Sequence, residues 1–197
     1  MLVVLRYLGE EAPEQFIETA YSFGANGLLQ TPLSIKLLHR AVQQNGQAWP
    51  KGRFDLFSSA TKALAVENND DYEGKRRLSA ERRLALAGRI SLVMLLSGAE
   101  HVWRSNKGKD DAGVDPRRLV DADELGVEIS ELSDVLDSSL FKGEGRRFEP
   151  MHRTIAEFLA ARTLARTVLG MDSEAAFPLS RAIALARSNL KCNTFLV

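Results

Sequence analysis

Hydrophobic residues recur at helical spacing along most of the chain. Apolar side chains at positions i, i+3, i+4 and i+7 are typical of helices that bury one face. Helices are therefore expected over about residues 13–23, 32–45, 54–65, 79–96, 130–140, 154–169 and 178–186. The pattern predicts a mainly α protein.

Two segments favour strands instead. Leu2 to Leu5 is β-prone and leads into a turn at Gly9, which predicts a short N-terminal strand that needs a partner from another chain or from the rest of a sheet. Near the other end, Gly143-Glu144-Gly145 separates Leu140-Phe141-Lys142 from Arg147-Phe148-Glu149, which predicts a small β-hairpin. Residues 106 to 116 show no periodicity and predict a mobile surface loop.

Three helix starts carry clear signals. Thr31 precedes Pro32, a good N-cap followed by a proline at the first helical position. Ser79 is an N-cap for the helix that follows it, and Thr154 with Glu157 forms a capping box. In the helix that begins at Pro32, the apolar face leaves His39 on the opposite side, which predicts a surface histidine.

Helices followed by a hairpin are the order of a winged helix. A polar stretch over residues 68 to 75 separates this part from the helices before it. We expect a helical lid with a residual N-terminal strand over 1–78, a winged-helix-like domain over 79–153 and a C-terminal helical segment over 154–187. The tail, 188–197, matches no pattern.

Composition narrows the class of protein only coarsely. Lys plus Arg and Asp plus Glu number 26 each among 197 residues, which argues against bulk neutralisation of nucleic-acid phosphates. The single cysteine, Cys192, has no internal disulfide partner, and no apolar run approaches the roughly 20 residues that span a bilayer. Without a signal-peptide pattern at the start, a cytoplasmic location without membrane contact is expected.

Motifs for independent catalysis are missing from the sequence. The Gly-Lys pairs Gly74-Lys75 and Gly108-Lys109 lack both the upstream glycine and the following Ser or Thr of a phosphate-binding loop. Asp121-Ala-Asp123 resembles the opening of a calcium loop, but Leu132 stands where the bidentate glutamate belongs. We therefore expect no enzyme, no metal site and no tightly bound cofactor for this chain.

One segment matches a specific signature. His152-Arg-Thr154-Ile-Ala-Glu157-Phe158-Leu-Ala-Ala161 resembles the His-x-Thr-x-x-Glu-Phe-Leu-Ala-Ala motif of NACHT-type ATPases of the STAND class. The segment that runs from Gly27 through Thr31-Pro32 to Leu38 resembles the lid-helix motif of the same class. The resemblance covers about residues 1–187.

The resemblance implies a regulatory role. It assigns to this chain the lid and winged-helix part of a signalling ATPase, whose P-loop core precedes the lid and binds ADP or ATP. His152 would contact the β-phosphate of ADP, and Pro32 would pack near the adenine. Arg153 stands where the Met-His-Asp version of the motif has an aspartate, so the aspartate's role does not transfer. The expected partners are proteins or a nucleotide-binding core.

Other interpretations stay open. His152 alternatively hydrogen-bonds backbone where the hairpin ends, and His101 and Trp103 are interpreted as packing residues. A basic cluster and an acidic block either face each other or form two solvated surfaces. The basic cluster comprises Lys75, Arg76, Arg77, Arg82, Arg83 and Arg89. The acidic block comprises Asp121, Asp123, Glu124, Glu128, Glu131, Asp134 and Asp137.

The alternative function is a stand-alone helical adaptor or a winged-helix nucleic-acid-binding protein. The expected recognition helix is acidic, from Glu131 to Asp137, and would repel phosphates. Nucleic acid is therefore a disfavoured partner.

Overall fold

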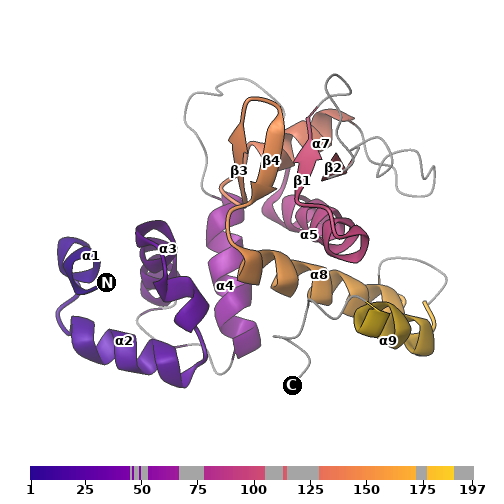
Figure 1. Cartoon of the computed structure of the whole chain (residues 1–197). Coiled ribbons are helices and arrows are strands. Elements are labelled where there is room, and N and C mark those ends of the chain that lie inside the picture. The colour runs from indigo at the N-terminus through magenta and orange to yellow at the C-terminus, as the bar shows by residue number, and fades with distance from the viewer. Residues whose placement is uncertain are drawn as a thin grey trace. The chain divides into compact units, whose positions relative to one another are not determined.

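The computed structural model describes residues 1–44, 46, 49, 53–66, 78–104, 113–114, 129–171 and 177–188 (Figure 1). The chain divides into two compact units, Met1–Glu67 and Asn68–Val197, and each is described by itself. The described part is mainly helical with a small sheet, which confirms the predicted fold class at that level. The domain boundaries predicted at residues 78, 153 and 187 stay predictions.

The described residues of the first unit form helices that share one core. The elements are α1 (Leu2–Tyr7), α2 (Pro13–Ser22), the 3-10 helix η1 (Asn26–Leu29), α3 (Pro32–Gln44) and α4 (Arg53–Val66). Helix α3 packs against α4, α1 and η1. The side chains at the centre, all almost fully buried, are Leu5, Ile35, Leu38, Leu56, Phe57 and Leu64.

The predicted N-terminal strand is wrong, because Leu2–Tyr7 forms α1. The carbonyl of Met1 accepts hydrogen bonds from the N–H groups of Val4 and Leu5 at 3.0 and 3.2 Å. A helix satisfies its backbone groups within the segment, so no partner strand is needed. Leu5 is fully buried, and this burial of one side chain per turn overrides the β preference of the segment.

In its described residues, the second unit joins four helices to a sheet. Its elements are α5 (Ala80–Ser97), β1 (His101–Trp103), β2 (Gly113–Val114), α7 (Ile129–Leu136), β3 (Phe141–Glu144), β4 (Arg147–Pro150), α8 (Arg153–Val168) and α9 (Leu179–Ser188). Helix α5 begins at the predicted cap, where Ser79 Oγ accepts the N–H of Arg82 at 3.2 Å, and ends at Gly98 with φ 68°. None of the helices in the described ranges is long and apolar enough to cross a membrane.

The sheet has the order β2-β1-β4-β3. Strand β1 is parallel to β2 and antiparallel to β4, and β3 and β4 form the predicted hairpin. Glu144 pairs with Arg147, so the turn is Gly145-Arg146, with Gly145 at φ 64°, and not the predicted Gly143 to Gly145. The prediction of a loop over 106–116 is wrong for Gly113–Val114, which forms β2. The other residues of that range lie outside the described ones.

Helices α5 and α8 make the main helical contact of this unit. At their crossing, a Cβ added at Gly88 would overlap Thr163 Oγ1 and lie 3.1 Å from the carbonyl oxygen of Leu159. The contact therefore leaves no room for a side chain at position 88 unless Thr163 shifts. This close crossing fixes α8, and with it the residues at its N-terminus, on the rest of the unit.

Candidate functional site

His152 lies where the hairpin passes into α8. The N–H of Met151 donates to the carbonyl of Leu140 at 2.9 Å, which fixes the end of β4 beside the start of β3. His152 follows in an extended conformation, with φ −148° and ψ 133°, and is the N-cap of α8. The histidine of the motif therefore sits at the positive end of a 16-residue helix.

The ring of His152 provides the cap itself. Its Nδ1 accepts the backbone N–H of Thr154 at 3.2 Å, and its carbonyl accepts the N–H groups of Ile155 and Ala156, both at 3.1 Å. An Nδ1 that accepts a hydrogen bond carries no proton, so the neutral ring holds its proton on Nε2. The predicted backbone hydrogen bond of His152 is thus confirmed.

The capping box predicted at Thr154 and Glu157 is wrong, because α8 begins at Arg153 and its N-cap is His152, two residues before Thr154. Glu157 instead accepts a hydrogen bond from Nε of Arg153, with 2.8 Å between Nε and Oε1. The Glu157 side chain is almost fully buried, whereas that of Arg153 is exposed. The acid of the motif therefore stabilises the first turn of α8 through a side-chain pair one turn apart.

The environment of His152 favours its neutral form. Partial burial lowers the pKa of His152 from its ordinary value of 6.5, and the negative charge of Glu157 offsets part of that decrease. A neutral ring at pH 7 keeps both the cap at Nδ1 and a donor at Nε2. The neutral ring can therefore donate its Nε2–H to an anion while Nδ1 keeps the hydrogen bond from Thr154.

Pro32 occupies the first position of α3 and is exposed. The preceding residue confirms the predicted cap: Thr31 Oγ1 accepts the N–H of Ser34 at 3.2 Å, and Ser34 Oγ accepts the N–H of Thr31 at 3.3 Å. Pro32 belongs to the first unit and His152 to the second. A nucleotide cleft shared by the two residues stays a prediction.

His39 is not the surface residue that was predicted. It is 7% exposed, and its Nε2 lies 3.1 Å from Oε2 of Glu10. Its ring contacts Phe16, with 5.7 Å between ring centroids. His39 shares the buried stripe of Ile35, Leu38 and Val42, and this i, i+4, i+7 spacing from Ile35 was the signal that could have revealed it.

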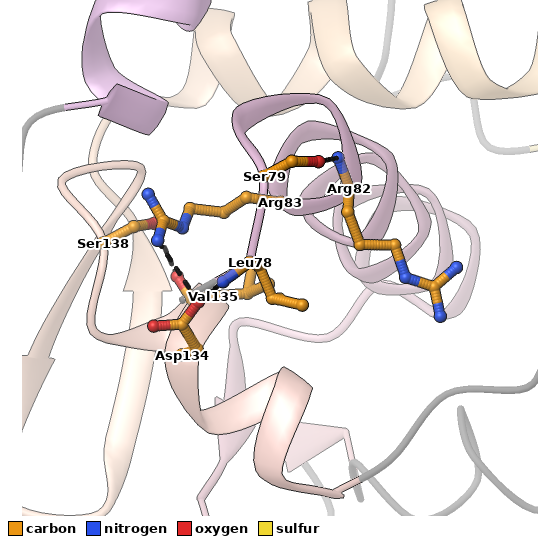
Figure 2. Close-up of polar contacts among 7 residues, drawn as sticks. All are labelled: Leu78, Ser79, Arg82, Arg83, Asp134, Val135 and Ser138. Carbon is orange, nitrogen blue, oxygen red and sulfur yellow. Dashed lines mark hydrogen bonds and ion pairs between the residues drawn. The ribbon is translucent and has the colours of Figure 1, made fainter. Parts of the chain in front are cut away.

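Arg82 and Arg83 of the basic cluster lie opposite Glu131 and Asp134 of the acidic block. Arg82 forms two hydrogen bonds with Glu131, at 3.2 and 3.0 Å, and these bonds raise the pKa of Arg82. Asp134 Oδ2 accepts both Nη2 of Arg83, at 3.2 Å, and the N–H of Leu78, at 3.3 Å (Figure 2). These bonds connect α7 to the first turn of α5. The cluster members before residue 78 and within 121–128 lie outside the described residues.

His101 and Trp103 pack together, as predicted. Both are buried in β1, with their ring centroids 4.8 Å apart and nearly perpendicular planes. A Cβ at Gly113 would overlap both rings, which explains why a glycine pairs with His101 in β2. Within the described ranges, no group of three or more His, Cys, Asp or Glu residues could hold a metal ion.

Comparisons of the chain with protein-family models, with curated proteins and with solved structures give no match.

Proposed function

We propose that the chain is the regulatory lid and winged-helix part of a nucleotide-dependent signal-transduction ATPase of the NACHT/STAND class, acting through protein contacts. The proposal rests on the motif from His152 to Ala161 and on the lid motif around Pro32. The nucleotide-binding core would be supplied by other residues of the architecture, because the sequence has no phosphate-binding loop.

The observation that carries the proposal is the placement of His152. The motif histidine caps α8 through Nδ1, so the neutral ring has Nε2–H as a donor beside the positive helix end. A helix N-terminus with a neighbouring donor is favourable for an anionic phosphate group. This chemistry supports the role that the resemblance assigns to His152.

The order of elements in the second unit supports the winged-helix interpretation. Among the described residues the order is α5, β1, β2, α7 and the β3–β4 hairpin, and β4 lies between β1 and β3 in the sheet. Such a domain followed directly by a histidine-capped helix is the arrangement that the NACHT-type resemblance implies. The capped start of α3 at Pro32 supports the lid assignment in the same way.

The physical role of such a part would be to set the population of a closed state. A nucleoside diphosphate supplies negative charge that His152 and the end of α8 favour. If these groups contact the nucleotide only when the chain is docked on the core, ADP stabilises the docked state by its difference in affinity. Exchange of the nucleotide then shifts the population towards the open state.

Retention of a P-loop core tests this proposal. The immobilised chain should retain a purified P-loop core of a NACHT-type ATPase more strongly with ADP than without nucleotide. The His152→Ala variant should lose the ADP-dependent increase, while the exposed hairpin-turn variant Arg146→Ala should keep it. Equal retention with and without ADP would contradict the proposal.

A second candidate is nucleic-acid binding through the hairpin and α7. The pairing of Glu131 and Asp134 with Arg82 and Arg83, and of Asp137 with Arg104, compensates the acidic charges that would repel phosphates. A gel shift with duplex DNA that weakens as salt rises would favour this function. No shift at low salt would leave the protein-contact function as the better account.

A further inference from the structure

The junction between α8 and α9 exposes large apolar side chains. Leu169 is 71% exposed, Met171 61%, Leu179 62% and Ile183 42%. Single exposed apolar residues are normal on a protein surface, but a group of them at one place indicates an interaction site.

Backbone hydrogen bonds bring these residues together. At the end of α8, the N–H of Met171 donates to the carbonyl of Arg166 at 2.9 Å and Gly170 adopts φ 66°. The N–H of Phe177 then donates to the carbonyl of Thr167 at 3.1 Å. The chain therefore turns back at Gly170, and the start of α9 lies beside the end of α8 (Figure 1).

The turn at Gly170 also explains why Met171 is exposed. In this type of helix end, the residue after the glycine commonly packs on the side chain that lies five positions earlier. Here that position is Arg166, which offers a charged group in place of an apolar one. The local sequence thus leaves Met171 available to a larger apolar surface.

The apolar face of α9 is exposed on both flanks of a buried centre. Ala182, 4% exposed, is that centre; Leu179 and Ile183 lie one turn apart on one flank, and Leu185, 36% exposed, lies on the other. Because the centre is already buried, α9 cannot lay its apolar face flat on a bilayer as an interfacial helix does. The flank with Leu179 and Ile183 is the more exposed one and is suited to a narrow apolar partner such as a single helix.

The charged residues in the described part of this surface are arginines. Residues 158–171 and 177–188 contain Arg162, Arg166, Arg181 and Arg187 and no Asp or Glu. Nη1 of Arg162 is buried without a hydrogen-bond partner in the described part of the chain. The connecting residues 172–176, with Asp172 and Glu174, lie outside the described residues. Arg187 lies one turn after Ile183 on the same side of α9, whereas Arg181 lies on the other side. Arginines beside apolar side chains are complementary to an acidic, amphipathic surface.

We propose that the α8–α9 surface docks an acidic amphipathic helix of a partner protein; the surface comprises Leu169, Met171, Leu179 and Ile183 with Arg162 and Arg187. Apolar residues of the partner would cover Leu179 and Ile183, and its carboxylates would pair with the arginines. Nucleic acid fits less well, because a phosphate backbone gains nothing from four exposed apolar side chains. The docking does not depend on the nucleotide function of His152.

A peptide-binding measurement tests this inference on the full chain. The probe is a fluorescein-labelled helical peptide with leucine at every third or fourth position and glutamate on its other face. Ile183→Glu and Arg187→Glu should each weaken its binding about tenfold, a change of about 1.4 kcal/mol. Tyr7→Glu, at a side chain that is 89% exposed in the first unit, should leave the affinity unchanged.

Further probes separate the possible occupants. Poly-glutamate should bind at least tenfold more weakly than the peptide, because charge alone does not fill the apolar flank. Failure of the chain to bind the peptide, or binding that Ile183→Glu leaves unchanged, would overturn the inference. The inference would also be overturned if the chain sediments with phosphatidylserine vesicles and Ile183→Glu abolishes that sedimentation. Since His152→Ala should leave peptide binding intact, failure of the nucleotide function is distinguishable from failure of this one.

Discussion

Nη2 of Arg83 and Oδ2 of Asp134 are 3.2 Å apart, and this pair connects the first turn of α5 to α7. The Arg83 side chain is 6% exposed, so its charge depends on the carboxylate for compensation. Figure 2 shows Asp134 reaching from α7 towards both Arg83 and the N–H of Leu78. A single carboxylate therefore joins the start of one helix to the middle of another.

Replacing Asp134 should destabilise the second unit measurably. Asp134→Ala removes two accepted hydrogen bonds, one of them in an ion pair with a buried guanidinium, for an expected loss of about 2 kcal/mol in the free energy of unfolding. Glu131→Ala is the matched control on the same helix, with a more exposed partner in Arg82 and an expected loss below about 1 kcal/mol. Urea unfolding measures both; equal losses would contradict the assigned difference.

Gly88→Ala should lower the free energy of unfolding, although alanine has the higher helix propensity. In an exposed helix, Gly→Ala stabilises by about 1 kcal/mol. In α5 the new Cβ would overlap Thr163 Oγ1, so Gly88→Ala should destabilise by about 1 to 3 kcal/mol. A double-mutant cycle with Thr163→Ala should recover part of that loss; a stabilising Gly88→Ala would show that the two helices do not cross there.

The helical state of the N-terminus can be tested with two residues. In a strand, Val3 and Leu5 would point to the same side, whereas in α1 Leu5 is buried and Val3 is 78% exposed. Leu5→Ala should therefore reduce the free energy of unfolding by about 3 kcal/mol, and Val3→Ala by less than about 0.5 kcal/mol. Similar effects at both positions in thermal or urea unfolding would favour a strand.

Protonation of His152 should weaken the second unit. Its pKa in the folded state lies below the ordinary 6.5, so the unfolded chain takes up the proton first as pH falls. The stability from this group is fully present above pH 6.5 and decreases as pH falls below 6.5 towards the folded-state pKa.

The His152→Asn variant isolates this effect, because asparagine also caps helices but does not titrate. Urea unfolding at about pH 7.5 and about pH 5.5 should show a smaller decrease in the variant than in the unchanged chain. An identical decrease in both chains would assign the pH dependence to other groups.

Much of the helical framework was predictable from local signals. Pro32, Ser79 and Pro178 mark helix starts because capping and the fixed φ of proline act within one turn. The hairpin was predictable, but its turn was not, because the close packing of Gly143 on Phe148 within the sheet decides the register. Strands β1 and β2 escaped prediction, since two or three residues carry no periodicity.

The candidate site was predictable in its residues and less so in its contacts. The motif identified His152, yet the ring's role as the cap was not evident, because Thr154 and Glu157 satisfy the sequence rule for a capping box. Whether the basic and acidic clusters pair could not be decided from composition. The pairing depends on how α7 packs against α5, which is set by side chains distant in sequence.

The central claim, that His152 belongs to a nucleotide-holding switch, is tested most directly by calorimetric titration with ADP. The chain alone should bind ADP negligibly, and its mixture with the P-loop core should bind it with an affinity that His152→Ala weakens about tenfold or more. Tight ADP binding by the chain alone would contradict the account, and so would an ADP affinity of the mixture that His152→Ala leaves unchanged.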